Sequence, residues 1–108
     1  MPVHARFTRH AGGCGTVHAN AAGDVPARLE ALGAVAGLDR AALHSQLAAA
    51  LSVVVHLVRD RSGRRRVAEI HVLERGPDGI VGTVPALRGA ERGPGWDRLA
   101  ALCERGRP

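Results

Sequence analysis

Apolar residues recur every three or four positions over two adjoining stretches of the chain, which is typical of helices that bury one face. The first stretch has them at spacings of 4, 3 and 3, at Val25, Leu29, Leu32 and Val35. The second has them at a spacing of 4, at Leu43, Leu47 and Leu51. Asp24 and Asp39 precede the two stretches as favoured N-cap residues, and Gly37 follows the first as a favoured residue beyond a helix end. The pattern predicts a helical hairpin of two short helices.

The period changes after the second stretch. Residues 53–58 form a continuous, mostly β-branched run, Val-Val-Val-His-Leu-Val, which predicts a strand buried on both faces. Turn residues that end in glycine occupy 60–63, and residues 65–73 predict the returning strand. The segment 53–73 is therefore predicted to be a β-hairpin.

The sequence does not decide which face of the returning strand is buried. Val67 shares parity with Glu69 and His71, whereas Ile70 and Val72 have the other parity. Because apolar residues stand on both sides, alternation does not decide which side is buried.

The two ends of the chain give weaker patterns. Residues 1–9 have no clear period and are predicted to be a lead-in, and HAGGCG at 10–15 is a glycine-rich loop before a short strand over 15–20. Beyond the hairpin, a turn at 76–79 predicts a third strand over 80–84, ended by Pro85. Residues 88–95 are predicted to be a linker, and 96–103 a short helix.

The fold class is α/β: a short strand, a helical hairpin, then an antiparallel β-hairpin with a third strand.

Composition removes several classes of function. The chain has 108 residues, enough for one small domain, and all 15 of its basic residues are arginine. Without a lysine these residues hold neither a Walker A P-loop nor a Schiff-base site. Aromatic residues make up only 2%, which argues against modules that stack bases on aromatic rings.

Charge and cysteine content place the protein in broad terms. The net charge of +5 permits binding to phosphates, nucleic acid or an anionic membrane surface without establishing any of them. Cys14 and Cys103 lie far apart and do not form a disulfide framework. No signal peptide and no membrane-spanning run is recognisable, so we expect a cytoplasmic protein.

A group of histidine and cysteine residues lies in the glycine-rich loop. His10, Cys14 and His18 follow one another in the pattern H-x3-C-x3-H. Metal motifs normally show two regular pairs, and the glycines between these residues disfavour the helix that would bring them together. We therefore predict no metal site, and keep a metal-binding protein as one competing hypothesis.

Two further groups are candidates for binding. His18 and Asn20 stand where the glycine-rich loop and its strand end, a place from which they could contact a phosphate oxygen or orient a water. Five arginines surround the turn of the β-hairpin, at Arg59, Arg61, Arg64, Arg65 and Arg66. Such a cluster binds phosphate, nucleic acid or an acidic partner surface, or is simply a solvated turn. His44, His56 and His71 are predicted to be hydrogen-bonded structural residues.

The segment His10 to Ala21, HAGGCGTVHANA, resembles the His box of the type II/IV secretion ATPases, the hexameric motors of secretion systems and pili. DVPARLEAL at 24–32 is similar to the helix that follows this box, and GRRRV with Glu69-Ile70 is similar to the family's Gly-x-Arg-x-Val hairpin. The likeness covers residues 10–87 and is nearest to the tight-adherence pilus branch. It implies the C-terminal part of a RecA-like P-loop ATPase fold, with residues 88–108 as a linker and short helix.

The resemblance also implies roles for single residues. His10 and His18 would lie near the γ-phosphate of ATP, with Thr16 and Asn20 supporting the loop, and Arg64, Arg65 and Arg66 would face a subunit surface. The family uses ATP and Mg²⁺, but its Walker A and Walker B segments precede the His box and are absent from these 108 residues. We therefore expect a truncated motor that hydrolyses no ATP alone and uses no cofactor alone.

Partners follow from the same resemblance. We expect secretion ATPase subunits or self-association, with peripheral membrane association through a secretion complex, and we do not expect nucleic acid. The alternative is a small arginine-rich module that binds nucleic acid or an anionic surface.

Overall fold

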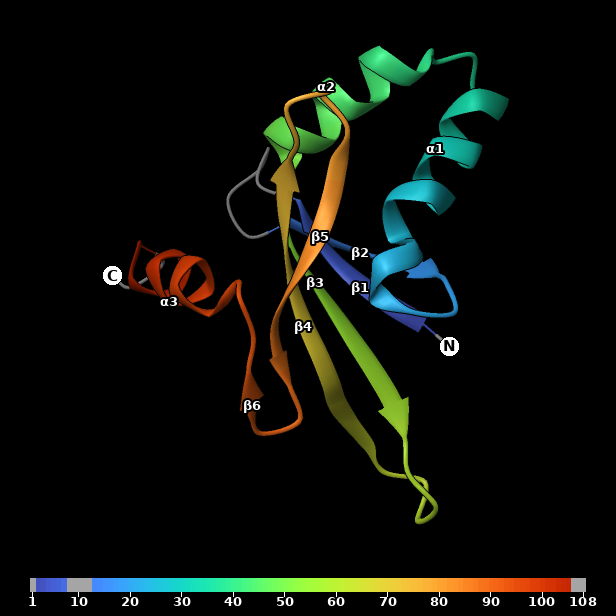
Figure 1. Cartoon of the computed structure of the whole chain (residues 1–108). Helices are drawn as coiled ribbons and strands as arrows, with labels where there is room; N and C mark the ends of the chain where they lie inside the picture. Colours follow the sequence, from blue (N-terminus) through green and yellow to red (C-terminus); the bar gives the residue numbers. More distant parts are fainter. Residues whose placement is uncertain (1, 8–12, 106–108) are drawn as a thin grey trace.

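The helices of this protein pack against one antiparallel sheet. The computed structural model describes residues 2–7 and 13–105, and within them six strands pair in the order β2-β1-β3-β4-β5-β6. The strands are β1 (Pro2–Phe7), β2 (Gly13–His18), β3 (Leu51–Arg59), β4 (Arg65–Arg75), β5 (Val81–Arg88) and β6 (Glu91–Arg92). The helices are the 3₁₀ turn η1 (Ala22–Asp24), α1 (Val25–Val35), α2 (Arg40–Ala50) and α3 (Trp96–Arg105). Figure 1 shows α1 and α2 at one end of the sheet and α3 at its side.

The predicted helical hairpin is confirmed, except that Leu51, predicted to belong to the second helix, is the first residue of β3. Asp39 caps α2, because its carboxylate accepts a hydrogen bond of 2.7 Å from the Ala42 amide. Gly37 has a φ of 85°, the left-handed conformation that ends α1 at low cost for a glycine. Asp24 stands at the N-cap of α1 as predicted, but its side chain makes no capping hydrogen bond.

The predicted apolar face of α1 is only half right. Val25 is fully buried and Leu29 is half-buried, but Leu32 is 49% exposed and Val35 is 90% exposed. The helix meets α2 through Gly33 instead, where an added Cβ would lie 3.2 Å from the Leu43 side chain. Figure 1 shows α1 running away from the sheet toward its C-terminal end, which leaves the last turn of the apolar face uncovered.

Both faces of the sheet are covered, by different helices. On one face Val54, Leu73 and Val81 pack with Val25 of α1 and with Leu43 and Leu47 of α2. On the other face Val72 and Ala86 pack with Leu99 of α3. This arrangement explains why parity did not decide the buried side of the returning strand. Val72 and Leu73 are neighbours in the sequence, and their side chains pack into the hydrophobic clusters on opposite faces of the sheet.

The sheet differs from the expectation at three places. Residues 2–7 were expected in a lead-in without regular structure, whereas they form β1 and pair with β2 and β3. Strand β5 continues through Pro85 to Arg88, because Pro85 sits at a register shift of the β4 ladder, where a missing N–H is tolerated. The expected linker 88–95 contains the short strand β6, and the expected C-terminal helix is α3. The domain boundaries at residues 9/10 and 87/88 stay a prediction.

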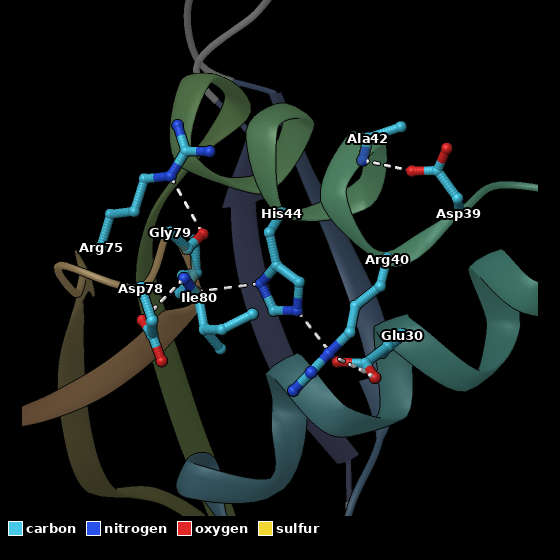
Figure 2. Close-up of polar contacts among 10 residues, drawn as sticks. Glu30, Asp39, Arg40, Ala42, His44, Arg75, Asp78, Gly79 and Ile80 are labelled. Carbon is cyan, nitrogen blue, oxygen red and sulfur yellow. Dashed lines mark hydrogen bonds and ion pairs between the residues drawn. The ribbon is translucent and has the colours of Figure 1, made fainter.

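A buried histidine joins the two helices to the sheet. His44 of α2 is 1% exposed, and its Nδ1 accepts a hydrogen bond of 3.0 Å from the Val81 amide of β5. Since that amide can only donate, Nε2 carries the ring proton and donates it to Glu30 of α1 at 2.9 Å. The Glu30 carboxylate also forms an ion pair with the Arg40 guanidinium, at 3.1 Å. Figure 2 shows both partners of Glu30. The prediction of His44 as a hydrogen-bonded structural residue is confirmed.

This contact predicts a loss of stability in acid. The hydrogen bond from His44, helped by Arg40 and opposed by desolvation, holds the pKa of Glu30 below its usual 4.5. A carboxyl whose pKa is lower in the folded state stabilises the fold above the unfolded value, and this contribution is lost as pH falls through the folded pKa. The urea midpoint should therefore fall as the pH is lowered below the usual 4.5 of this carboxyl. Glu30→Gln should show a smaller fall, and an equal fall in the variant would contradict this assignment.

Candidate functional site

A hollow of about 580 Å³ lies where β2 ends and α1 begins. The residues that line it come from the strand end, the bend after it and the first turns of α1: His18, Ala19, Asn20, Asp24, Ala27 and Arg28. The hollow therefore coincides with the segment that the sequence singled out for its His-x-Asn pair. Its polar groups are an imidazole, an amide, a carboxylate and a guanidinium.

Two buried residues hold this segment in place. Ala22 of η1 and Val25 of α1 are both fully buried in the core beneath the helical hairpin. The chain between β2 and α1 is thus anchored at its middle, while His18, Asn20 and Arg28 on either side stay exposed. Small residues such as Ala22 allow the bend to lie directly on the sheet. A fixed backbone with exposed polar ends is a good platform for a ligand contact.

The structure brings some of the predicted residues together and not others. His18 and Asn20 both line the hollow, whereas Thr16 on β2 is exposed and does not line it. His10 lies outside the described residues. Arg64, Arg65 and Arg66 belong to the hairpin between β3 and β4 and do not line the hollow. The segment that holds His18 and Asn20 and the arginine-rich hairpin are therefore separate surfaces.

Arg28 and Asp24 were not predicted as site residues. Asp24 was predicted to be a helix cap, but its carboxylate makes no capping bond and lines the hollow instead. Arg28 follows one turn later on α1, and within the described part of the chain it forms no ion pair. Its spacing of four residues from Asp24 was the available signal, because positions i and i+4 share a face of a helix.

A second polar cluster lies on the sheet face that α1 and α2 cover. Glu69 of β4 accepts hydrogen bonds from Arg88 at 2.7 Å and from His71 at 3.4 Å. His71 also contacts the Thr83 hydroxyl at 3.1 Å through Nδ1. Desolvation raises the pKa of Glu69, but the bonds from His71 and Arg88 and their charges outweigh it, so this pKa lies below its usual value. These contacts tie β4 to β5 and confirm His71 as a structural residue.

His56 departs from the prediction made for it. It is 8% exposed, and neither ring nitrogen has a hydrogen-bond partner among the described residues. Its Nδ1 lies 3.6 Å from the Glu69 carboxylate, close enough for electrostatic attraction but too far for a hydrogen bond. His56 is buried, but it is not the hydrogen-bonded residue that was expected.

Metal-ligating side chains do not cluster in the part of the chain that the structure describes. Within residues 16–105, whose side chains the structure describes, no three His, Cys, Asp or Glu side chains gather so that they could hold a metal ion. The metal hypothesis for His10, Cys14 and His18 rests partly on residues outside that range. Among the helices in the described ranges, none is long and apolar enough to cross a membrane.

Comparison with known families gives a match over most of the chain. The sequence model of the type II/IV secretion system protein family matches residues 1–78. This range includes residues 1–9, which were predicted to lie outside the family-like part, and it includes β1 to β4 and the hollow.

Two curated relatives in Mycobacterium tuberculosis are similar to this chain. Each is named a "Putative conjugal transfer protein", one from strain CDC 1551 and one from strain H37Rv. Both are 61% identical over 93 residues, which is 86% of this chain and 26% of the relative. The chain thus spans about a quarter of the length of these relatives. No solved structure matches it.

Proposed function

Because this chain belongs to the type II/IV secretion system protein family, we propose that it carries the His-box part of a secretion motor ATPase. In this proposal the fold is the C-terminal part of a RecA-like ATPase domain, and the motor serves secretion or pilus assembly, with the tight-adherence branch as the nearest type. The relatives are named for conjugal transfer, which is the same class of process. The protein works at the cytoplasmic face of such a complex.

The observation that carries the proposal is the hollow beside α1. An amide and an imidazole at the strand end, with a guanidinium one helical turn into α1, are the donors that phosphate oxygens require. His18 is proposed to contact the terminal phosphate or to orient the attacking water. Thr16 and Asn20 support its loop, and His10 has the same proposed role as His18. Arg28 adds a positive charge to the lining of the hollow.

The residues of this chain supply only part of what ATP hydrolysis needs. Phosphoryl transfer depends on a P-loop lysine and on metal ligands that bridge the phosphates, and these 108 residues contain no lysine. Asp24 is the one carboxylate among the residues that line the hollow. We therefore propose that ATP and Mg²⁺ are held by a Walker A segment that lies outside these 108 residues, and that the 108 residues dock on the part of the motor that carries it.

Two measurements test this proposal. A malachite-green assay on the purified chain should show no phosphate release above background. The tagged chain should co-purify with a co-expressed, full-length member of the family that has a Walker A lysine, and His18→Ala should co-purify equally well. Phosphate release that persists in His18→Ala would contradict the site, and failure to co-purify would contradict docking.

A further inference from the structure

The hairpin between β3 and β4 extends beyond the rest of the sheet. Strand β1 pairs with β3 only as far as His56, and β5 pairs with β4 only from Glu69 onward. Residues 57–59 and 65–67 therefore pair only with each other among the described residues. Figure 1 shows this two-stranded ribbon at the end of the molecule opposite α2. We call residues 57–67 the basic ribbon.

The basic ribbon holds most of the protein's net charge. It contains five arginines and one aspartate, a net charge of +4 in a chain of net charge +5. All five arginine side chains are exposed, and within the described part of the chain none of them forms an ion pair. Arg59 and Arg65 stand directly opposite each other across the two strands. Like charges in that position destabilise a hairpin, so this arrangement favours an external anion.

The single acid of the ribbon does not neutralise it. The Asp60 carboxylate accepts hydrogen bonds from the Ser62 hydroxyl at 2.6 Å, the Ser62 amide at 2.9 Å and the Arg64 amide at 3.0 Å. These bonds form the turn, with Gly63 at a φ of 84°. The bond from the Ser62 hydroxyl, with the amide bonds and the charge of Arg66, holds the pKa of Asp60 below its usual value. Asp60 thus shapes the turn and leaves the guanidinium groups available.

We propose that the basic ribbon binds the phosphate backbone of duplex nucleic acid without sequence preference. A duplex presents about one negative charge per 1.7 Å of its axis, so it can neutralise several guanidinium groups of one short ribbon together. A two-stranded β-ribbon also has the width that the major groove admits. The ribbon has no aromatic residue, so it cannot bind single strands by stacking their bases on aromatic rings.

Other partners fit this surface less well. A second copy of the chain is disfavoured because each copy carries a net positive charge. The family resemblance suggested a subunit surface as the partner. Such a surface would need several carboxylates close together opposite the tip of the ribbon, whereas protein surfaces normally intersperse positive and negative charges. The sequence kept nucleic acid as an alternative partner of the arginine cluster, but it did not reveal that the arginines stand on a projecting ribbon with two of them opposed.

Fluorescence anisotropy with a labelled 20-base-pair duplex tests the proposal on the full chain. The variant Arg65→Gln/Arg66→Gln should weaken binding about tenfold or more at low salt. It should also reduce the slope of log K against log salt concentration by about 0.9 for each phosphate that the variant no longer neutralises. The matched control Arg98→Gln/Arg105→Gln removes two exposed arginines of α3 and should leave the slope unchanged. A second duplex of unrelated sequence should bind equally well.

Three outcomes would overturn the proposal. One is an equal effect of the control variant, and another is the absence of duplex binding at low salt. The third is tighter binding to poly-L-glutamate or to phosphatidylglycerol vesicles than to the duplex, which would assign the ribbon to an acidic protein or a membrane. A thermal melt guards against misfolding: the duplex should raise the melting midpoint of the wild type and not that of the ribbon variant. This test does not depend on the proposed ATPase relationship.

Discussion

Replacing His44 with leucine is expected to lower the free energy of unfolding by about 2–4 kcal/mol. Leucine nearly fills the same volume, so the loss comes from hydrogen bonding and not from a cavity. The Val81 amide would lose its acceptor in a buried place, which is the costly part, and Glu30 would lose the bond that joins α1 to α2. Urea denaturation followed by far-UV circular dichroism measures the difference.

A matched substitution separates this effect from the general effect of losing a histidine. His18 is exposed, so His18→Leu should change stability by less than about 0.5 kcal/mol. Combining His44→Leu with Glu30→Gln should cost less than the sum of the single changes, because both remove the same hydrogen bond. A stable His44→Leu protein, or full additivity, would show that the His44 hydrogen bonds do not hold the helices to the sheet.

Replacing Gly93 with alanine is the second change with a large expected effect. A Cβ at Gly93 would collide with the carbonyl group of Pro85, a backbone group that cannot turn aside. The same loop donates hydrogen bonds from Gly93 to Ala86 and from Gly95 to Pro85, and so places α3 against the sheet. We expect a loss of about 1–3 kcal/mol or more, with α3 displaced from the core around Val72.

Trp96 gives this prediction a local readout. It is the only tryptophan of the chain, and Arg92 lies 4.3 Å from the centre of its ring. Displacement of α3 should shift the emission maximum of Trp96 to longer wavelength at urea concentrations below the global unfolding transition. Gly82→Ala is the matched control, because an added Cβ at Gly82 of β5 meets nothing within 4 Å. Equal stability of the two variants would contradict close packing at Gly93.

The sequence predicted the elements whose residues repeat at one clear period. The helical hairpin and the β-hairpin were found because caps, turn glycines and apolar spacing agree at Asp39, Gly37 and Gly63. The uncovered end of α1 was not predictable, since spacing shows which residues share a face but not what packs against it. Val35 continues the apolar pattern and is nevertheless 90% exposed.

Strands that depend on distant partners were harder to predict. Residues 2–7 alternate between apolar Val3, Ala5 and Phe7 and polar His4 and Arg6, a strand signal that was missed. Their pairing with β3 joins positions separated by the whole helical hairpin. Pro85 normally ends a strand, but the register shift opposite it removes the need for its N–H. At Pro85, long-range pairing overrides local preference.

The candidate site was predicted in part. His18 and Asn20 were found because the glycine-rich loop and the family resemblance both pointed to them. Arg28 and Asp24 line the same hollow because η1 turns the chain back toward β2. Their spacing of four residues shows that they share a helix face, but no local pattern predicts this turn. The projection of the basic ribbon likewise follows from where the neighbouring strands stop pairing.

The order of strands in the sheet also affects how the chain can fold. Strands β3, β4 and β5 follow one another in sequence and in the sheet, so they can form early through short loops. Strands β1 and β2 precede them on the chain, yet β1 pairs with β3 and β2 lies beyond β1 in the sheet. During synthesis the first strands therefore emerge before the strand that they need. One edge of β1 stays open to other chains until residues 51–59 have left the ribosome, which makes translation speed and chaperone access relevant to the yield of folded protein.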